Sequence, residues 1–344
     1  MLDVLRFWMA RGVDGFRVDA IHHLFEDRLL RDNPANPDWR NDMSPARRLT
    51  RLHTMDQPEV HEAIVEMRQV ADSYGDRLMI GEAYLPIDRL MAYYGVDLTG
   101  FHLPFNFHLI STPWKPEAIA ILINSYEAAL PPGGWPNWVL GNHDRSRVAS
   151  RLGQEQARVA AMLLLTLRGT PTIYQGEELG MRDVPIAREQ VQDPWEKNVP
   201  GLGLGRDPAR TPIPWCDDHQ GGFTTGRPWL PVDVTAIADA RRQSADPHSS
   251  LSLYRRLLGV RRAEPALSIG SYRKIAHTDS VLVYERQHGR RRLRVALNFS
   301  ALVQQLPAGE AFGKVLLSTM TEDVPQPRTV QQLQAHEGLI FEVP

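Results

Sequence analysis

Cysteine is almost absent from this chain of 344 residues, in which Cys216 is the only one. A lone cysteine cannot form a disulfide within the chain, and it cannot build a metal site from several thiolates. The length instead allows a sizeable apolar core, in one large domain with a smaller one beside it. A chain without disulfides suits a reducing compartment, so we expect a soluble protein of the cytoplasm.

Long apolar runs and an excess of one charge are also missing. The longest apolar run, residues 159–165, is far too short to span a bilayer. The opening MLDVLRFWMARG carries charges among its apolar residues, unlike a signal peptide. The chain holds 39 Lys and Arg against 41 Asp and Glu, so nothing electrostatic predicts nucleic acid or an anionic membrane as a partner. Neutral ligands suit this surface, and the sequence leaves the oligomeric state open.

The usual metal-binding motifs do not occur. The chain has no HExxH and no cysteine pair, and its one close histidine pair is His22 and His23, whose side chains we expect to diverge on a regular element. We therefore predict no catalytic metal and no cofactor.

Strand-like and helix-like patterns alternate over most of the chain. The first helical pattern covers residues 2–9, and Gly12 stands where a helix commonly ends. Strand-like runs then follow at residues 13–19, 77–82, 101–108, 137–140 and 170–174, and helical patterns at residues 59–74, 116–130, 154–167 and 249–262. This order predicts an α/β fold with parallel strands. Its most common large closed form is the eight-stranded β/α (TIM) barrel, of which about five strands are visible here.

Two further regions complete the predicted organisation. Residues 181–231 are rich in proline, glycine and charge, which indicates a long loop near the top of the barrel or a partly disordered segment. Short strand-like runs such as SVLVYER, LRVALNF and GLIFEV follow near the C-terminus. We therefore assign residues 1–264 to the β/α barrel and residues 265–344 to a small antiparallel β domain of the sandwich type.

Three acidic residues directly follow predicted strands: Asp19 after GFRV, Glu82 after LMIG and Asp144 after VLGNH. In β/α barrels the active site is built at this end of the strands, so acids from different strands can converge. Glycoside cleavage needs such carboxylates, because one protonates the leaving oxygen while another stabilises or bonds to the sugar carbon. Any one of them alone would more often cap a helix or pair with an arginine.

The segments around these acids resemble a known family. GFRVDAIHH, IGEAY and VLGNHDRSR resemble, in the expected order, three signature segments of the α-amylase family (family thirteen) of glycoside hydrolases. TPTIYQGEELGM resembles that family's last barrel strand and the loop after it, and RDPARTPIPW is similar to a segment of its α-glucosidase and oligo-glucosidase branch. The resemblance covers residues 12–215.

The resemblance implies a role for each acid: Asp19 as nucleophile, Glu82 as general acid/base and Asp144 as transition-state stabiliser. Arg17 precedes Asp19 by two residues on the same strand face, where it should favour the ionised form of Asp19. Glu82 must hold a proton near neutral pH, so we expect burial or nearby negative charge to raise its pKa. His143 should contact sugar hydroxyls together with Asp144.

Four other residues of these motifs have weaker assignments. Arg147 and Arg210 are candidate substrate contacts, and the resemblance of RTPIPW places Arg210 near the bound glucose, but each could equally be a solvated surface arginine or an internal salt-bridge partner. His22 and His23 follow the nucleophile, where they either line the neighbouring subsite or pack without touching substrate.

The implied activity is hydrolysis of α-glucosidic bonds in maltose-like oligosaccharides with retention of configuration, as part of carbohydrate metabolism. Ala20, directly after the nucleophile, resembles enzymes that prefer α-1,4 links, whereas valine there resembles α-1,6 specialists. Oligo-1,6-glucosidase, trehalose synthase and other transglucosylases share the same carboxylates and stay open as alternatives.

The family's first signature segment, a strand that carries Asp and ends in Asn-His, has no counterpart before Gly12. We therefore expect a fragment that lacks three barrel strands and the domain inserted after the third. A truncated enzyme of this kind should fold poorly and have weak activity. A non-catalytic relative or a split subunit, which would bind carbohydrate or a complementary chain, is the alternative of another class.

Overall fold

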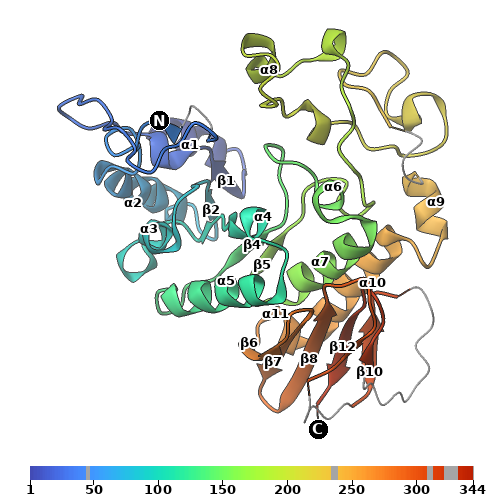
Figure 1. The fold of residues 1–344 in the computed structure, drawn as a ribbon. Coiled ribbons are helices and arrows are strands. Elements are labelled where there is room, and N and C mark those ends of the chain that lie inside the picture. The colour runs from blue at the N-terminus through green and yellow to red at the C-terminus, as the bar shows by residue number, and fades with distance from the viewer. Residues whose placement is uncertain (44–46, 234–238, 308–312, 321–331, 344) are drawn as a thin grey trace. The chain divides into compact units, whose positions relative to one another are not determined.

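The structure, a computed structural model, describes residues 1–43, 47–233, 239–307, 313–320 and 332–343. The chain divides into two compact units. The first unit comprises Met1–Asn106 and Ser125–Asn137, and the second comprises Phe107–Asn124 and Trp138–Pro344. Figure 1 labels the helices and strands of both.

A three-stranded parallel sheet forms the centre of the first unit. Its strands β1 (Gly15–Val18), β2 (Leu78–Gly81) and β3 (Leu103–Pro104) lie in the order β1-β2-β3. Gly15 is required where β1 and β2 meet, because a Cβ atom there would lie 2.2 Å from the Leu78 carbonyl oxygen. The close pairing brings the ends of β1 and β2 side by side.

Helix α2 (Glu59–Asp72) packs against this sheet through its apolar face. Helix α1 (Leu2–Met9) buries Leu5 and Met9 and packs against α2, which connects β1 to β2. The other helical elements of the unit are short: η1 (Ile21–His23), α3 (Ile87–Met91), η3 (Ala92–Tyr94) and η4 (Val96–Leu98). Helix α1 ends just before Gly12, as predicted, and Gly12 has a positive φ of 91°.

The second unit contains the remaining α/β elements. Strands β4 (Asn137–Val139) and β5 (Thr170–Thr172) pair with each other, and α7 (Gln154–Thr166), between them, is buried along most of its length. The short helices α4 (His108–Ser111) and α6 (Val148–Leu152) belong here, and α5 (Pro116–Ala129) crosses the border between the two residue ranges. Four of the five predicted strands and each of the four later predicted helices form within a few residues of their expected positions, whereas the strand predicted at residues 101–108 is limited to β3 (Leu103–Pro104), and α4 begins at His108.

The segment 181–231 contains short helices rather than loop alone. They are η5 (Arg188–Gln190), α8 (Pro194–Asn198), η6 (Asp207–Ala209) and η7 (His219–Gly222), and α9 (Ala240–Ala245) follows. Asp193 begins α8, because its side chain accepts a hydrogen bond of 3.2 Å from the Trp195 backbone N–H and proline occupies the first helical position. Short helices therefore interrupt the predicted loop.

An antiparallel sheet occupies the C-terminal part of the second unit. Helices α10 (Ser250–Ala263) and α11 (Pro265–Ser268) precede it. Its strand order is β10-β12-β8-β7-β6, and a separate antiparallel pair joins β9 to β11. The bounds are β6 (Ser271–His277), β7 (Val281–His288), β8 (Arg291–Asn298), β9 (Gln304–Gln305), β10 (Val315–Ser318), β11 (Gln332–Leu333) and β12 (Gly338–Glu342).

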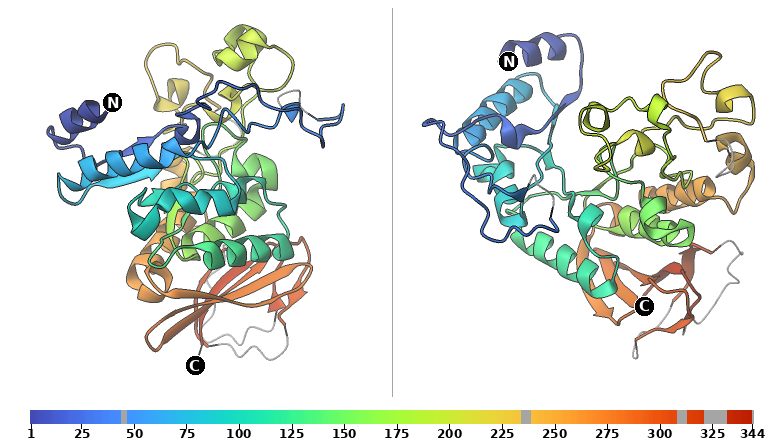
Figure 2. Two further views of the ribbon diagram at one scale, coloured as in Figure 1. Left: turned by 90° about the vertical axis from the view of Figure 1, so that its left-hand side faces the viewer. Right: turned by 45° about the horizontal axis from the view of Figure 1, so that its top comes forward.

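Both faces of this sheet are covered. One face packs Val281 and Val283 against Leu333 and Phe341. Helices α7, α10 and α11 pack against the sheet (Figures 1 and 2), and Tyr284 exchanges a hydrogen bond with Thr166 of α7. Strand β7 is consequently buried at six consecutive positions. The predicted border between residues 264 and 265 falls just before α11, inside the second unit, and the division into two domains there stays a prediction.

Among the helices of the described ranges, none combines the length and apolarity needed to cross a membrane.

A buried arginine joins α7 to the sheet, and its replacement should measurably weaken the fold. Arg286 has no exposed surface, and it donates hydrogen bonds to the carbonyls of Ser271 at 3.1 Å, of Gly270 at 2.8 Å and of Thr166. Arg286→Lys leaves some of these buried carbonyls without a donor. We expect the free energy of unfolding, measured by denaturant titration, to fall by about 2–4 kcal/mol.

The matched control is Arg290→Lys, at the exposed turn between β7 and β8. It should change the free energy of unfolding by less than about 0.5 kcal/mol. Equal unfolding midpoints for the two variants would contradict the bridging role of Arg286.

Candidate active site

One arginine in the first unit binds two of the three predicted catalytic carboxylates. Arg17 donates from Nη1 to Asp19 Oδ1 at 2.6 Å and from Nη2 to Glu82 Oε2 at 2.7 Å. The backbone makes this possible, because the Glu82 N–H donates to the Val18 carbonyl at 2.9 Å and so places the first residue after β2 beside the end of β1. Asp19, Glu82 and Arg17 therefore lie together, as the strand positions predicted.

The two carboxylates differ in their surroundings. The Asp19 side chain is 75% exposed, whereas that of Glu82 is 6% exposed. Burial raises the pKa of Glu82, and a hydrogen bond with Asp19 raises it further, against the opposing effects of the Ala20 N–H and of Arg17. The predicted direction of this pKa shift is confirmed. One carboxyl group is thus open to an incoming ligand, while its neighbour retains a proton more readily than an ordinary glutamate.

The backbone turn after Asp19 is strained, and its N–H groups bind Glu82. Ala20 adopts a left-handed conformation with φ 40° and ψ 37°, which is unfavourable for a residue that has a Cβ atom. This conformation directs the Ala20 N–H to Glu82 Oε2 at 3.1 Å, and the following Ile21 N–H donates to the Glu82 carbonyl at 3.1 Å. The strained turn therefore contributes two contacts that hold Glu82.

The two histidines after this turn occupy different environments. His22 is 4% exposed, and its pKa falls to about 4, chiefly because of burial and then because of the neighbouring His23, so its ring is neutral at physiological pH. His23 is exposed, with Nδ1 3.2 Å from the Thr54 carbonyl oxygen. Their rings do not diverge as expected, since the centroids are 4.2 Å apart in a 3₁₀ turn rather than on a strand. Within the described residues, no group of three or more His, Cys, Asp or Glu is arranged to hold a metal ion.

Asp144, in the second unit, is held by two arginines. Its Oδ1 atom accepts hydrogen bonds from Arg210 Nη2 at 2.8 Å and from Arg206 Nη1 at 3.1 Å, and His143 Nε2 lies 3.5 Å away. Arg210 also donates from Nε to the His143 carbonyl at 2.8 Å. The structure therefore brings the predicted residues Asp144, His143 and Arg210 together.

The sequence reasoning missed Arg206 and its partner Asp193. Arg206 donates from Nε to Asp193 Oδ2 and from Nη2 to Asp193 Oδ1, both at 2.8 Å, and this pairing holds the pKa of Asp193 well below its usual range. Within RDPAR, Arg206 and Arg210 flank the 3₁₀ helix η6, and this spacing could have indicated that both contact the same acid. Asp193 left no comparable signal, because it lies in the segment 181–231, which the sequence predicts to be a long loop.

Arg147, predicted near the substrate, lies in the interior instead. It is 1% exposed, donates from Nη1 to the Gln175 carbonyl at 2.7 Å and lies 5.1 Å from the centroid of the Tyr174 ring. Its backbone N–H donates to Asp183 Oδ1 at 2.8 Å. This burial contradicts the alternative of a solvated surface arginine and argues against a contact with substrate.

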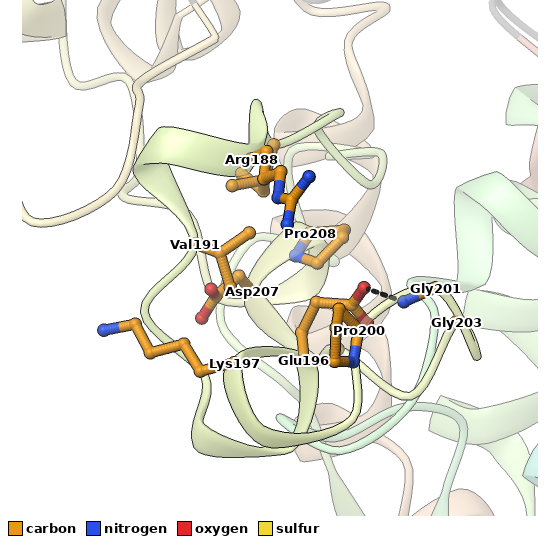
Figure 3. A pocket seen from close by; sticks show the side chains of 11 residues that line it. Arg188, Val191, Glu196, Lys197, Pro200, Gly201, Gly203, Asp207 and Pro208 are labelled. Carbon is orange, nitrogen blue, oxygen red and sulfur yellow. Dashed lines mark hydrogen bonds between the residues drawn. The ribbon is translucent and has the colours of Figure 1, made fainter.

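A cavity of about 910 Å³ lies within the segment that carries Arg206 (Figure 3). Charged side chains of both signs line it, among them Arg188, Lys197, Glu196 and Asp207. Asp207 is 2% exposed, and its Oδ2 atom accepts hydrogen bonds from the backbone N–H groups of Gln192 at 2.6 Å and Asp193 at 2.9 Å. One wall of the cavity therefore supports the backbone of Asp193.

Comparison with known proteins identifies the family. The alpha amylase catalytic domain family matches residues 1–270 of the chain, so the protein belongs to this family. Maltase A1 of Drosophila melanogaster is 38% identical over 309 residues, which cover 83% of this chain and 53% of that protein. The human amino acid transporter heavy chain SLC3A1 is 31% identical over 369 residues, which cover 99% of this chain and 51% of that protein.

A solved structure supports the same assignment. The crystal structure of the alpha-glucosyl transfer enzyme XgtA matches with a TM-score of 0.89 and 33% identity, over 99% of this chain and 66% of that one. The predicted fold class, a partial β/α barrel followed by a small antiparallel β domain, is thereby confirmed. The chain spans about half the length of the two relatives and two thirds of the solved structure.

A buried glutamate next to the strand end that carries Asp144 should make the free energy of unfolding depend on pH. Glu177 is 3% exposed, and both its carboxyl oxygens are buried without a hydrogen-bond partner among the residues that the structure describes. A Cβ atom at Gly141, three residues before Asp144, would lie 2.5 Å from Glu177 Oε1. Burial raises the pKa of Glu177 to about 8, so the folded protein keeps a proton that the unfolded chain releases above about pH 4.5.

The folded state binds this extra proton, so the proton stabilises the folded state relative to the unfolded chain. This contribution to the free energy of unfolding is complete below about pH 4.5 and disappears as the pH rises through 8. Glu177→Gln replaces the carboxyl group by a neutral amide of similar shape. Its free energy of unfolding should therefore exceed that of the wild type by at least about 2 kcal/mol at pH 9, and by much less at pH 5. Denaturant titrations at both pH values test this, with the exposed Glu189→Gln as control. An unchanged difference between the two pH values would mean that Glu177 is ionised in the folded protein.

Proposed function

We propose that this protein is a retaining glycosidase that cleaves the α-glucosidic bonds of maltose-like oligosaccharides in carbohydrate metabolism, with Asp19 as nucleophile and Glu82 as general acid/base. The observation that carries the proposal is the single guanidinium of Arg17, which binds an exposed Asp19 and a buried Glu82 with a raised pKa. Two carboxyl groups that bind the same guanidinium lie close enough for direct attack with retention of the anomeric configuration. Inverting enzymes instead leave room for a water molecule between their two carboxyl groups.

The contacts of each residue suit its proposed step. Asp19, ionised beside Arg17, attacks the anomeric carbon while Glu82 donates its proton to the departing glycosidic oxygen. The glucosyl–aspartate ester then reacts with water, whose proton returns to Glu82. After the first transfer Glu82 carries a negative charge, which the Arg17 Nη2 and the Ala20 N–H already face. The stabilising donors are therefore in place before the charge forms.

Asp144, His143 and Arg210 are proposed to bind the sugar. Asp144 would stabilise the electron-poor ring of the transition state through its hydroxyl groups, and His143 is proposed to contact the same hydroxyls. Arg210 supports this arrangement, since it binds both the Asp144 carboxylate and the His143 backbone. Arg147 and His23 stay predictions as substrate contacts, and the burial of Arg147 argues against it.

Transfer of glucose to a second sugar is the next candidate activity. It is favoured by the similarity to the alpha-glucosyl transfer enzyme XgtA. Hydrolysis and transfer share the covalent intermediate and differ only in whether water or a sugar hydroxyl attacks it. The product ratio from maltose distinguishes the two. Ala20, a small residue beside the nucleophile, favours α-1,4 over α-1,6 links in either case.

A non-catalytic role is the candidate of another class, supported by the likeness to a transporter heavy chain. The pairing of Asp19 with a protonatable Glu82 argues for chemistry instead, because a binding module needs no buried acid of raised pKa beside an exposed carboxylate. We also propose a cytoplasmic protein that binds neither nucleic acid nor membranes, as its balanced charge suggests.

The covalent intermediate gives the first test of this function. A 5-fluoro-α-glucosyl fluoride forms the ester faster than it hydrolyses, so the labelled peptide can be identified by mass spectrometry. We expect one glucosyl adduct, on Asp19, and a loss of at least about 10³-fold in kcat/KM for Asp19→Asn. An adduct on any other residue would refute the assignment of the nucleophile.

The second test concerns the proton donor. Glu82→Gln cannot protonate a leaving group, so kcat/KM for maltose should fall by about 10²–10⁴-fold. An aryl α-glucoside with an acidic phenol needs little protonation, and its glucosylation should be much less affected. The alkaline limb of the wild-type pH profile should also disappear in the variant, because it reports loss of the Glu82 proton. Equal losses for both substrates would show that Glu82 is not the acid.

A further inference from the structure

We propose that Asp193 and Arg206 are positioning residues for Asp144, which hold its carboxylate so that one oxygen is bound by cations and the other faces the sugar. This inference rests on the proposed function, and it assigns a part of the proposed site to a residue pair that the motifs around the three acids do not contain.

The hydrogen bonds of the Asp144 carboxylate are one-sided. The contacts that the structure describes for this side chain all go to Oδ1, from Arg206 Nη1 at 3.1 Å, Arg210 Nη2 at 2.8 Å and His143 Nε2 at 3.5 Å. The side chain as a whole is 26% exposed. Oδ2 is therefore the oxygen that can accept hydrogen bonds from a sugar, and the carboxylate cannot rotate without breaking two bonds to arginine.

Arg206 itself is held more firmly than a surface arginine. Its Nε and Nη2 donate to the two oxygens of Asp193 at 2.8 Å, and its backbone N–H donates to Asp193 Oδ2 at the same distance. This two-pronged pairing fixes the plane of the guanidinium, so the remaining Nη1 points at Asp144 in one direction only. A lysine could supply the charge but not this orientation.

Asp193 is fixed in turn by the fold around it. Its side chain has no exposed surface, and it accepts the N–H of Trp195 that begins helix α8. Asp207 Oδ2 accepts the backbone N–H groups of Gln192 and Asp193 at 2.6 and 2.9 Å. An unbroken series of hydrogen bonds thus runs from Asp207 through Asp193 and Arg206 to Asp144. The buried pair requires good geometry, because a buried charge without its partner is strongly destabilising.

The alternative is that the pair only joins parts of the 181–231 segment. A structural link of that kind would predict lower stability, with any loss of activity independent of Asp144. Positioning predicts that the loss falls on kcat more than on KM and that it depends on Asp144, because a misdirected carboxylate fails mainly in the transition state.

The experiment uses the whole chain with an aryl α-glucoside as substrate. Asp193→Asn keeps the size of the side chain but weakens its hydrogen bonds with Arg206. Arg206→Lys keeps the positive charge but removes the planar guanidinium whose orientation Asp193 fixes. We expect each to lower kcat by about 10–100-fold with less than a threefold change in KM. Arg227→Gln, an exposed position of the same segment, should leave both constants unchanged.

A double-mutant cycle then separates positioning from structure. In an Asp144→Asn background, Arg206→Lys should reduce the residual kcat by less than twofold, because the group that it orients is already altered. The same 10–100-fold loss in both backgrounds would overturn the proposal. So would normal activity of both single variants. Thermal melts show whether each variant folds. If Asp193→Asn does not fold, Arg206→Lys alone still tests the proposal.

A crystal structure of the Asp193→Asn chain gives a readout that needs no turnover. Arg206 Nη1 should leave hydrogen-bonding distance of Asp144, and the Asp144 carboxylate should change its orientation. An unchanged Arg206–Asp144 contact refutes the positioning role even if the wild-type chain proves inactive. Inactivity of the wild type on every α-glucoside would count against the proposed function alone.

Discussion

The guanidinium of Arg17 is the group on which the candidate chemistry depends. Asp19 and Glu82 come from different strands, and two carboxylates this close would repel each other if both were ionised without a cation between them. Arg17 places a cation beside both of them, and burial raises the pKa of Glu82. Because the strand pairing fixes where both acids stand, the difference between them comes from solvent exposure, 75% for the Asp19 side chain and 6% for that of Glu82.

Much of this arrangement could be predicted from sequence, because it depends on local patterns. Helical and strand periodicity gave the five barrel strands and their helices, since each is set by residues close together in the chain. The placement of Arg17 beside Asp19 followed from the two-residue repeat of a strand. The raised pKa of Glu82 followed from the role of general acid/base that the resemblance implies, because such a group must hold a proton near neutral pH.

The parts that could not be predicted depend on contacts between distant segments. Arg206 and Asp193 lie 13 residues apart in a proline- and glycine-rich region where periodicity gives no information. The burial of Arg147 depends on Tyr174 and Gln175. The left-handed conformation of Ala20 could not be predicted either, because alanine gives no local sign of a positive φ. Contacts with Glu82, which is distant in the chain, offset the strain.

The attachment of helix α7 to the antiparallel sheet has an evolutionary consequence. Gln156 donates to the Asn298 carbonyl, Arg158 donates to the Thr319 carbonyl, and Thr166 shares a hydrogen bond with Tyr284. The helix is therefore bound near both ends to β7, to β8 and to the residue after β10, all of which lie more than a hundred residues further along the chain. A gene exchange with a breakpoint between them would combine a helix from one ancestor with a sheet from another. A replacement sheet would therefore have to offer hydrogen-bond partners at the same three places on the helix, two of them backbone carbonyls and one the hydroxyl of a tyrosine.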